Sequence, residues 1–246
     1  MCTLSWKPGP AGYRLWFNRD EQRTRPPATP PVLLKRNGVS CLAPFDGAGG
    51  TWLLVNTHGL TLALLNHYPA VPPAMPAAPH SRGLLPLACA GCASVREALA
   101  CCASQALADY RPFHLAAASG QEAAVLTWDG HSHTAAWLPP QGGMLTSSGW
   151  RPESVAQSRH AAFASLVGPM AQAAPERLEA FHRHRGEEAA AGIRMARPDA
   201  CTHSIARIDV SWLEGAAHFR YEPQMEIQPM PATTTSRLYL ENPGHA

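Results

Sequence analysis

Short apolar runs separated by turn residues occur along most of the chain, a pattern typical of β-hairpins. Because short turns join neighbouring runs, we expect the sheets to be mainly antiparallel. The predicted strands are Cys2–Trp6, Tyr13–Phe17, Thr51–Asn56, Leu60–Leu65, Phe113–Ala117, Ala123–Trp128, Thr134–Leu138, Met144–Thr146, His203–Trp212 and Ala216–Tyr221.

Three segments have the apolar spacing or the end signals of helices. Ser94–Tyr110 begins with a Ser that is followed three residues later by Glu97, which is the pattern of a capping box. Pro152–Leu166 and Pro175–His184 each have Pro in the first turn, where proline suits a helix. The Pro-rich stretches 21–31 and 69–79 and the tail after Glu222 are predicted to be irregular.

The predicted elements alternate between groups of strands and groups of helices. This order favours an α+β fold in which two antiparallel sheets lie between helical layers. With 246 residues the chain is long enough for one large core. We therefore expect a single domain over residues 1–246, with the irregular tail at its end.

Composition narrows the function classes. The net charge of +2 is too small to indicate nucleic-acid binding, and no apolar run reaches the roughly 18 residues that a membrane span needs. No secretory signal pattern opens the sequence. The seven cysteines are therefore expected to be reduced thiols in a cytoplasmic protein.

Cys2 is the leading candidate for chemistry. It follows the initiator Met1, which aminopeptidases remove when the next residue is small. The mature chain would then begin with a cysteine whose α-amine has a pKa near 8. Such a residue can serve as both nucleophile and general base.

The other cysteines and the histidines invite a metal hypothesis that the spacing does not favour. Cys89 and Cys92 form a C-x-x-C pair, but the adjacent Cys101 and Cys102 lie on a predicted helix, where neighbours diverge by about 100°. We expect buried apolar thiols here, no metal and no cofactor. The pair His131 and His133 is likewise expected to be structural.

Several motifs in order resemble the NRDE family, which contains the transport and Golgi organisation protein 2 homologues. They are Met1-Cys2, Phe17-Asn18-Arg19-Asp20-Glu21, Gly49-Gly50-Thr51-Trp52-Leu53 with Asn66, and Leu145-Thr146-Ser147-Ser148-Gly149-Trp150. The same motifs resemble N-terminal-nucleophile (Ntn) cysteine hydrolases of the bile-salt hydrolase and penicillin V acylase type. That resemblance implies an αββα four-layer sandwich.

The resemblance also implies roles for individual residues. Cys2 would be the nucleophile, Asp20 would hold its α-ammonium group, and Asn66 would donate to the oxyanion. Arg19 or Arg159 would keep the sulfur ionised. Asn18 matches the Asn-x-Asp element of the hydrolases.

This chain departs from the hydrolase pattern at two positions. Phe17 stands where the hydrolases have Arg, and Ser147 stands where a second oxyanion-hole Asn is expected. The Pro/Ala-rich loop from Pro69 to Pro79 and the segment around Trp150 are expected to line the entrance.

Two function classes remain open. The first is a hydrolase or acyltransferase that acts on carbon–nitrogen bonds of a small acylated molecule, or on a thioester. The second is a non-catalytic carrier of haem or of a lipid or acyl-CoA-type hydrophobic ligand. The sequence gives neither the substrate nor the oligomeric state.

Overall fold

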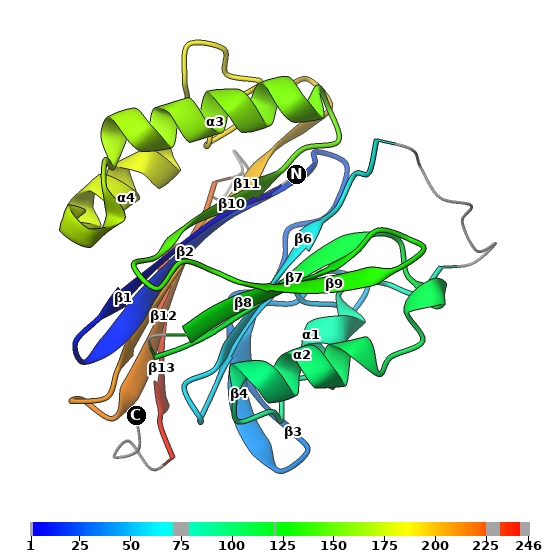
Figure 1. The fold of residues 1–246 in the computed structure, drawn as a ribbon, viewed down its shortest axis with the longest axis vertical. Helices are drawn as coiled ribbons and strands as arrows, with labels where there is room; N and C mark the ends of the chain where they lie inside the picture. The colour runs from blue at the N-terminus through cyan, green and yellow to red at the C-terminus, as the bar shows by residue number, and fades with distance from the viewer. Residues whose placement is uncertain (1, 71–78, 121, 225–231, 242–246) are drawn as a thin grey trace.

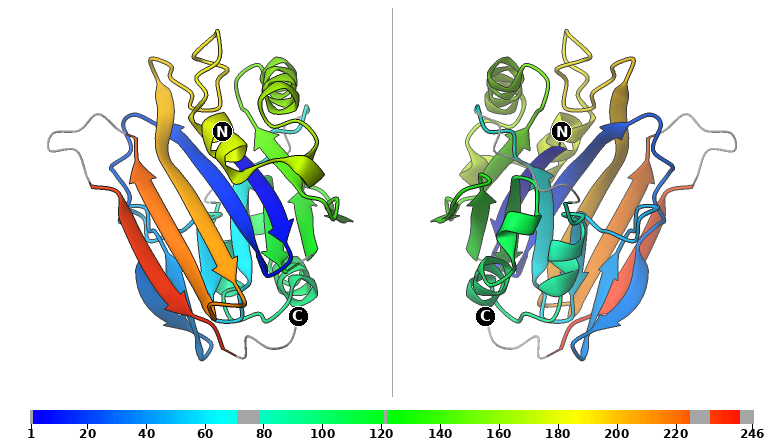
Figure 2. Two further views of the ribbon diagram at one scale, coloured as in Figure 1. Left: turned by 90° about the vertical axis from the view of Figure 1, so that its left-hand side faces the viewer. Right: turned by 90° about the vertical axis from the view of Figure 1, so that its right-hand side faces the viewer.

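The computed structural model describes residues 2–70, 79–120, 122–224 and 232–241. Two antiparallel sheets pack face to face, and helices cover the outer face of each (Figure 1). Figure 2 shows the same layers from the two sides of the molecule. The predicted α+β fold with an αββα arrangement is confirmed.

Sheet A carries the start of the chain. Within the described ranges it has six strands in the order β10-β1-β2-β11-β12-β13, and all its named pairs are antiparallel. Their bounds are β1 Cys2–Gly9, β2 Gly12–Gln22, β10 Gly143–Ser147, β11 Ala200–Ser211, β12 Ala216–Pro223 and β13 Thr234–Tyr239. The strand that begins with Cys2 is therefore paired on both sides.

Sheet B is the second inner layer. In the described part of the chain it has seven strands in sequential order from β3 to β9. Their bounds are β3 Val32–Arg36, β4 Val39–Ala43, β5 Leu53–Asn56, β6 Thr61–Asn66, β7 Phe113–Ser119, β8 Glu122–Trp128 and β9 His133–Trp137.

The helical layers lie on opposite sides of the sandwich (Figure 1). Sheet A is covered by α3 and α4, and sheet B is covered by α1 and α2. The bounds are α1 Leu84–Ala88, α2 Val95–Ala103, α3 Pro152–Leu166 and α4 Pro175–Arg183, with short 3₁₀ turns at Leu107–Asp109 and Met170–Gln172.

The sequence missed several elements and overestimated one. Strands β3 and β4 lie just after the Pro-rich stretch, and β13 lies in the tail that we expected to be irregular. Both β3 and β13 are edge strands with mostly exposed or half-buried side chains, and their sequences lack the alternation of apolar and polar residues that marks a half-buried strand. Most of the predicted 69–79 loop lies outside the described residues.

The predicted Ser94–Tyr110 helix has the expected start and an earlier end. The Ser94 hydroxyl accepts from the Glu97 amide at 3.2 Å, and the Glu97 carboxylate accepts from the Ala93 amide at 2.7 Å. The helix ends at Ala103, where the Ser104 hydroxyl and the Gln105 side chain both donate to the Cys101 carbonyl. These two side chains satisfy the Cys101 carbonyl, which would accept a backbone amide if the helix continued.

Alternate residues of β1 serve different layers. Cys2, Leu4 and Trp6 belong to the core between the sheets. Thr3 and Ser5 point the other way, because they hydrogen bond to Arg159 of α3 and His182 of α4. This alternation follows from the two-residue period of a strand.

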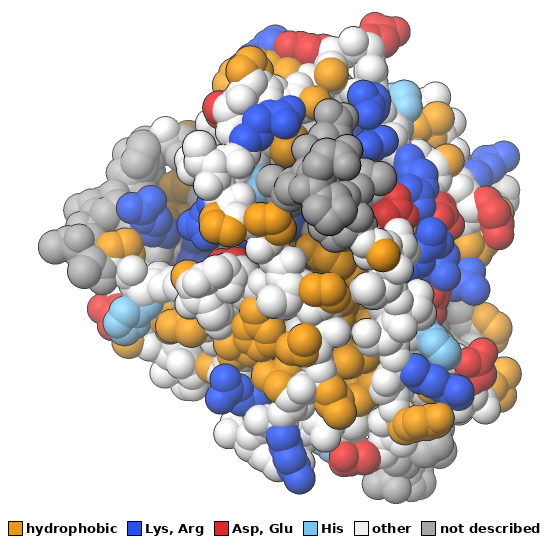
Figure 3. All heavy atoms as spheres, turned by 180° about the vertical axis from the view of Figure 1, so that it is seen from behind, with side chains coloured by type: hydrophobic (Ala, Val, Ile, Leu, Met, Phe, Trp, Pro, Cys, Tyr) orange, Lys and Arg blue, Asp and Glu red, His pale blue; other side chains and the backbone are white. Residues whose placement is uncertain are grey.

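Figure 3 shows the back of the molecule. Apolar side chains form an area near the middle of this face, and charged side chains of both signs lie mainly towards its edges.

Within the described residues, none of the helices has the length and apolar character needed to span a bilayer.

The buried imidazole of His182 ties α4 to sheet A. Asn18 donates through Nδ2 to the carbonyls of His182 and Ile193, so its Oδ1 accepts from His182 Nδ1 at 2.7 Å. The other ring nitrogen, Nε2, then accepts from the Ser5 hydroxyl at 2.7 Å. The neutral ring is thus fully hydrogen-bonded.

This arrangement predicts a loss of stability in acid. Burial lowers the pKa of His182 from 6.5 to about 3, and the Arg159 and Arg183 charges act in the same direction. Between pH 6.5 and pH 3, His182 is protonated in the unfolded chain but stays neutral in the folded chain. The free energy of unfolding should therefore fall as the pH drops from 6.5 towards 3. The slope for one such group is at most about 1.4 kcal/mol per pH unit.

Urea unfolding between pH 7.5 and pH 4.5 measures this slope. A His182→Gln variant should show a shallower dependence on pH than the parent. Equal slopes in the two proteins would contradict the assignment to His182.

Candidate functional site

A large cleft opens beside Cys2, at one end of the two sheets. Its volume is about 1270 Å³, and its wall is built from both sheets and from the loops that join their strands. Five of the sequence-predicted residues line it, namely Cys2, Arg19, Asp20, Asn66 and Trp150.

The β-sheet register places two polar residues beside Cys2. Cys2 is paired with Arg19 on β2 and with Ser147 on β10. Directly paired residues of antiparallel strands project to the same face, so these three side chains share the face that looks towards sheet B. Cys2 is only 7% exposed, and the Ser147 hydroxyl has no hydrogen-bond partner within the described residues.

The Cys2 thiol is held in its protonated form by its surroundings. Burial raises its pKa above the usual value, and the Asp20 carboxylate adds to this effect. A backbone hydrogen bond from Asp20 and the Arg19 charge act in the opposite direction. Ionisation of the sulfur therefore needs a base nearby.

Arg19 is the arginine that lies next to Cys2. Its guanidinium stacks on the Trp52 ring at 4.2 Å and forms an ion pair with Glu21 at 3.3 Å. Neighbouring residues of a strand project to opposite faces, and here Arg19 lies on the Cys2 face and the Asp20 carboxylate on the other. The Arg19 charge accordingly lowers the pKa of Cys2.

Asp20 and Arg159 form a buried ion pair on the helix side of sheet A. The Arg159 guanidinium donates to the Asp20 carboxylate at 3.1 Å, and both side chains have no exposed surface. The other carboxylate oxygen accepts from the Thr202 hydroxyl at 2.7 Å. Arg159 also donates to Thr3 at 2.8 Å, so it supports the strand that carries Cys2 from behind.

Asn18 is not in the cleft. Its amide is occupied by His182 and Ile193 on the helix side of sheet A, as described above. The structure therefore separates the predicted set into a cleft group and a group that packs under it.

Asn66 lies at the end of β6, across the cleft from sheet A. Its side-chain amide donates to the Tyr68 hydroxyl at 3.0 Å. Tyr68 in turn packs against Gly149, where an added Cβ would lie 2.6 Å from the ring. The glycine of the Ser147-Ser148-Gly149-Trp150 segment thus leaves room for the residue that orients Asn66.

Trp150 lines the cleft between two arginines. The guanidinium groups of Arg151 and Arg197 lie 5.0 and 5.4 Å from its ring centroid. The Ser148 hydroxyl accepts from the Trp150 amide at 3.1 Å and fixes the turn that carries the ring.

Several cleft residues were missed by the sequence analysis, among them Arg82, Arg111 and Tyr68. They lie in connecting segments, and the positions of such segments depend on long-range contacts that no local pattern encodes. A lone arginine or tyrosine in a loop gives no signal by itself.

Cys89 of the C-x-x-C segment lies closer to the two cysteines on α2 than we expected from the sequence. Cys89 contacts the side chains of both Cys101 and Cys102, although these two are neighbours on α2. All seven cysteines are free thiols. Among the described residues, no group of three His, Cys, Asp or Glu side chains is arranged to hold a metal ion.

Comparison with known families decides the classification. The family model described as Transport and Golgi organisation 2 matches residues 1–177, which is more than half of the chain. The chain belongs to the Transport and Golgi organisation 2 family. No curated protein sequence matches this family member.

Solved structures share its fold. Penicillin V acylase from Agrobacterium tumefaciens aligns with a TM-score of 0.58 and 10% identity, over 96% of this chain and 85% of the acylase. A mutant of conjugated bile acid hydrolase from Clostridium perfringens aligns with a TM-score of 0.50 and 13% identity, over 100% and 94% of the two chains. The fold is that of the Ntn hydrolases, as the resemblance implied.

Proposed function

We propose that this family member is an N-terminal-cysteine acyl hydrolase or acyltransferase that acts on a small amide or thioester. The observation that carries the proposal is the position of Cys2 and Asn66 in the wall of the large cleft. The buried Ser147 hydroxyl, unpartnered within the described residues, lies beside Cys2, because the two residues are paired across β1 and β10. A nucleophile and nearby hydrogen-bond donors are the minimum set for acyl transfer. The shared fold with acylases supports this assignment.

The reaction begins with removal of Met1, which exposes the α-amine of Cys2. This amine takes the thiol proton, which the buried thiol does not lose by itself. The thiolate attacks the carbonyl carbon, and the carbonyl oxygen becomes an oxyanion. The protonated amine then donates its proton to the leaving amine, and water releases the acyl group from sulfur.

Asn66 and Ser147 are the proposed oxyanion donors. The Asn66 amide has two N–H hydrogens, of which Tyr68 accepts one and leaves the second for the substrate. The Ser147 hydroxyl is buried beside Cys2, so it is a donor held ready without a competing partner in the described residues. Arg19 stabilises the thiolate, and the Asp20–Arg159 pair positions β1.

Asn66→Ala is expected to lower kcat by about 10²–10³-fold, the usual effect of removing an oxyanion donor. KM should change little, because the donor acts mainly on the transition state. Steady-state kinetics on a short-chain acyl amide measure both constants. A matched control is Tyr68→Phe, which keeps Asn66 but loses its partner and should cost less. Unchanged kcat in Asn66→Ala would contradict the role.

Intact-mass spectrometry tests the proposed function as a whole. The native protein is incubated with a panel of acyl amides and thioesters, and we expect loss of Met1 and a transient acyl adduct on Cys2. A protein that keeps Met1 excludes the α-amine mechanism. Tight binding of haem or of an acyl chain, without adduct or turnover, would instead support the carrier alternative.

A further inference from the structure

The charges of the cleft wall do not balance locally. Five arginines and four acidic residues belong to it, although the carboxylate of one of them, Asp20, points away from the cleft. Each carboxylate already has an arginine partner, and the pairs are Asp20 with Arg159, Glu21 with Arg19 and Arg25, Asp46 with Arg25, and Asp199 with Arg197. Arg82 and Arg111 have no carboxylate partner within the described residues.

Arg82 is the more confined of these two cations. It is half-buried, and Nη1 donates to the Pro112 carbonyl at 2.9 Å. That single carbonyl fixes the direction of the guanidinium but does not neutralise it. Burial lowers the pKa of Arg82, and the charge of Arg111 adds to this effect, whereas Tyr68, Cys2 and Glu21 act in the opposite direction. A cation that is partly removed from water without a counter-ion is costly, and an anion beside it would relieve that cost.

The Gly49-Gly50-Thr51-Trp52 motif builds the position of Arg82. The Thr51 amide donates to the Gly83 carbonyl at 3.0 Å, which joins the motif to the residue after Arg82. A Cβ on Gly83 would lie 2.8 Å from the Gly50 Cα, so only glycine permits this approach. Trp52 of the same motif supports Arg19 from below. The motif therefore fixes the backbone at Gly83, next to Arg82, and supplies the ring on which Arg19 stacks.

We infer that Arg82, together with Arg111, binds an anionic group of the substrate, a carboxylate or a phosphate, in the cleft beside Cys2. This inference rests on the proposal that the Cys2 cleft is the substrate site. Arg82, Arg111 and Cys2 all line this cleft. The anionic group is therefore held in the same cleft as the scissile bond, and an acyl amide without a charge binds less tightly.

Matched probes test this directly. N-decanoylglycine carries a carboxylate, decyl phosphate carries a phosphate, and N-decanoylglycinamide is neutral with the same chain. Binding is measured by isothermal titration calorimetry on the Cys2→Ser protein, so that no probe is consumed. We expect at least one anionic probe to bind about tenfold more tightly than the neutral one, as one charge-assisted contact allows.

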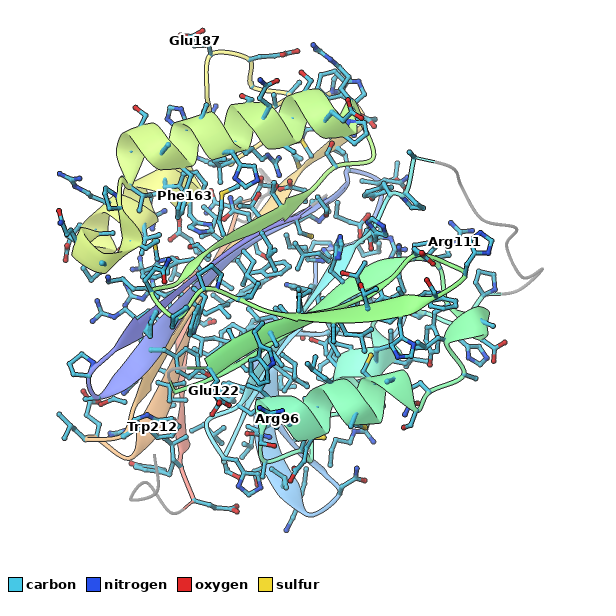
Figure 4. All side chains as sticks on the ribbon, viewed as in Figure 1. Arg96, Arg111, Glu122, Phe163, Glu187 and Trp212 are labelled. Carbon is cyan, nitrogen blue, oxygen red and sulfur yellow. The ribbon has the colours of Figure 1, made fainter. Side chains whose placement is uncertain are left out.

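Substitutions assign the preference to its residues. Arg82→Gln should remove the preference for the anionic probe and leave the affinity for the neutral probe unchanged. Arg96→Gln is the control, because Arg96 stacks on Trp137 and lies on α2, away from Arg111 (Figure 4). Arg111→Gln, at a more exposed site, should weaken the preference in part. If Arg82→Gln does not fold, the Arg111→Gln variant still tests the anion site.

The outcomes separate this inference from the proposed function. Equal affinity for the anionic and neutral probes overturns the anion site, even if the parent protein cleaves amides. A full preference that survives both Arg82→Gln and Arg111→Gln also overturns it. A preference that these variants remove supports the site, even if the parent protein turns over no probe and the hydrolase proposal fails.

Discussion

Replacing Cys2 with alanine is expected to lower acyl hydrolysis by at least about 10³-fold, because loss of the nucleophile leaves only binding and oxyanion stabilisation. The acyl adduct seen by mass spectrometry should disappear as well. Folding should be preserved, since Cys2 is a small side chain at the start of a strand that is paired on both sides.

Cys92 offers the matched control for this experiment. It is a half-buried thiol outside the cleft. Cys92→Ala should therefore keep full activity and the full adduct. If Cys2→Ala protein hydrolyses its substrate at the parent rate, the nucleophile assignment fails.

Arg159→Leu is expected to destabilise the protein by about 3–5 kcal/mol, the usual cost of leaving one partner of a buried ion pair alone. Among the described residues, the Asp20 carboxylate would then keep only the Thr202 hydroxyl as a side-chain partner, in a site without exposed surface. Thr3 and the Gly192 carbonyl would lose their donor too. Chemical denaturation measures the change in the free energy of unfolding.

A double variant isolates the ion pair from its neighbours. Asp20→Asn combined with Arg159→Leu should cost less than the sum of the two single changes, because no unpaired charge remains. The exposed pair of Arg151 and Glu188 is the control, and Arg151→Ala should cost less than about 1 kcal/mol. Additive effects in the double variant would show that the charges are not coupled.

Much of the fold was within reach of the sequence. The hairpins around Lys7–Pro10 and Glu214-Gly215 are local features, and turn residues mark them clearly. The Ser94 cap was equally local. Edge strands such as β13 were missed because exposed strands carry little periodic signal.

The site was harder to predict in detail. Motif order brought Cys2, Arg19 and Asn66 to one cleft, but the face of each side chain depends on strand register. Register is a long-range property, so the sequence could not tell that Arg19 faces Cys2 while Asp20 faces Arg159. The place of Arg82 in the cleft could not be predicted for the same reason, because it depends on a contact between Gly50 and Gly83 in two distant loops.

The place of β11 in sheet A has a consequence for the boundaries of this protein. The family match ends at residue 177, yet β11 begins at Ala200 and pairs with β2 on one side and β12 on the other. A chain cut at residue 177 would turn β2, the neighbour of the strand that carries Cys2, into an edge strand, and it would lose Thr202 from beside Asp20. The segment by which the family is recognised is thus shorter than the segment that must fold together.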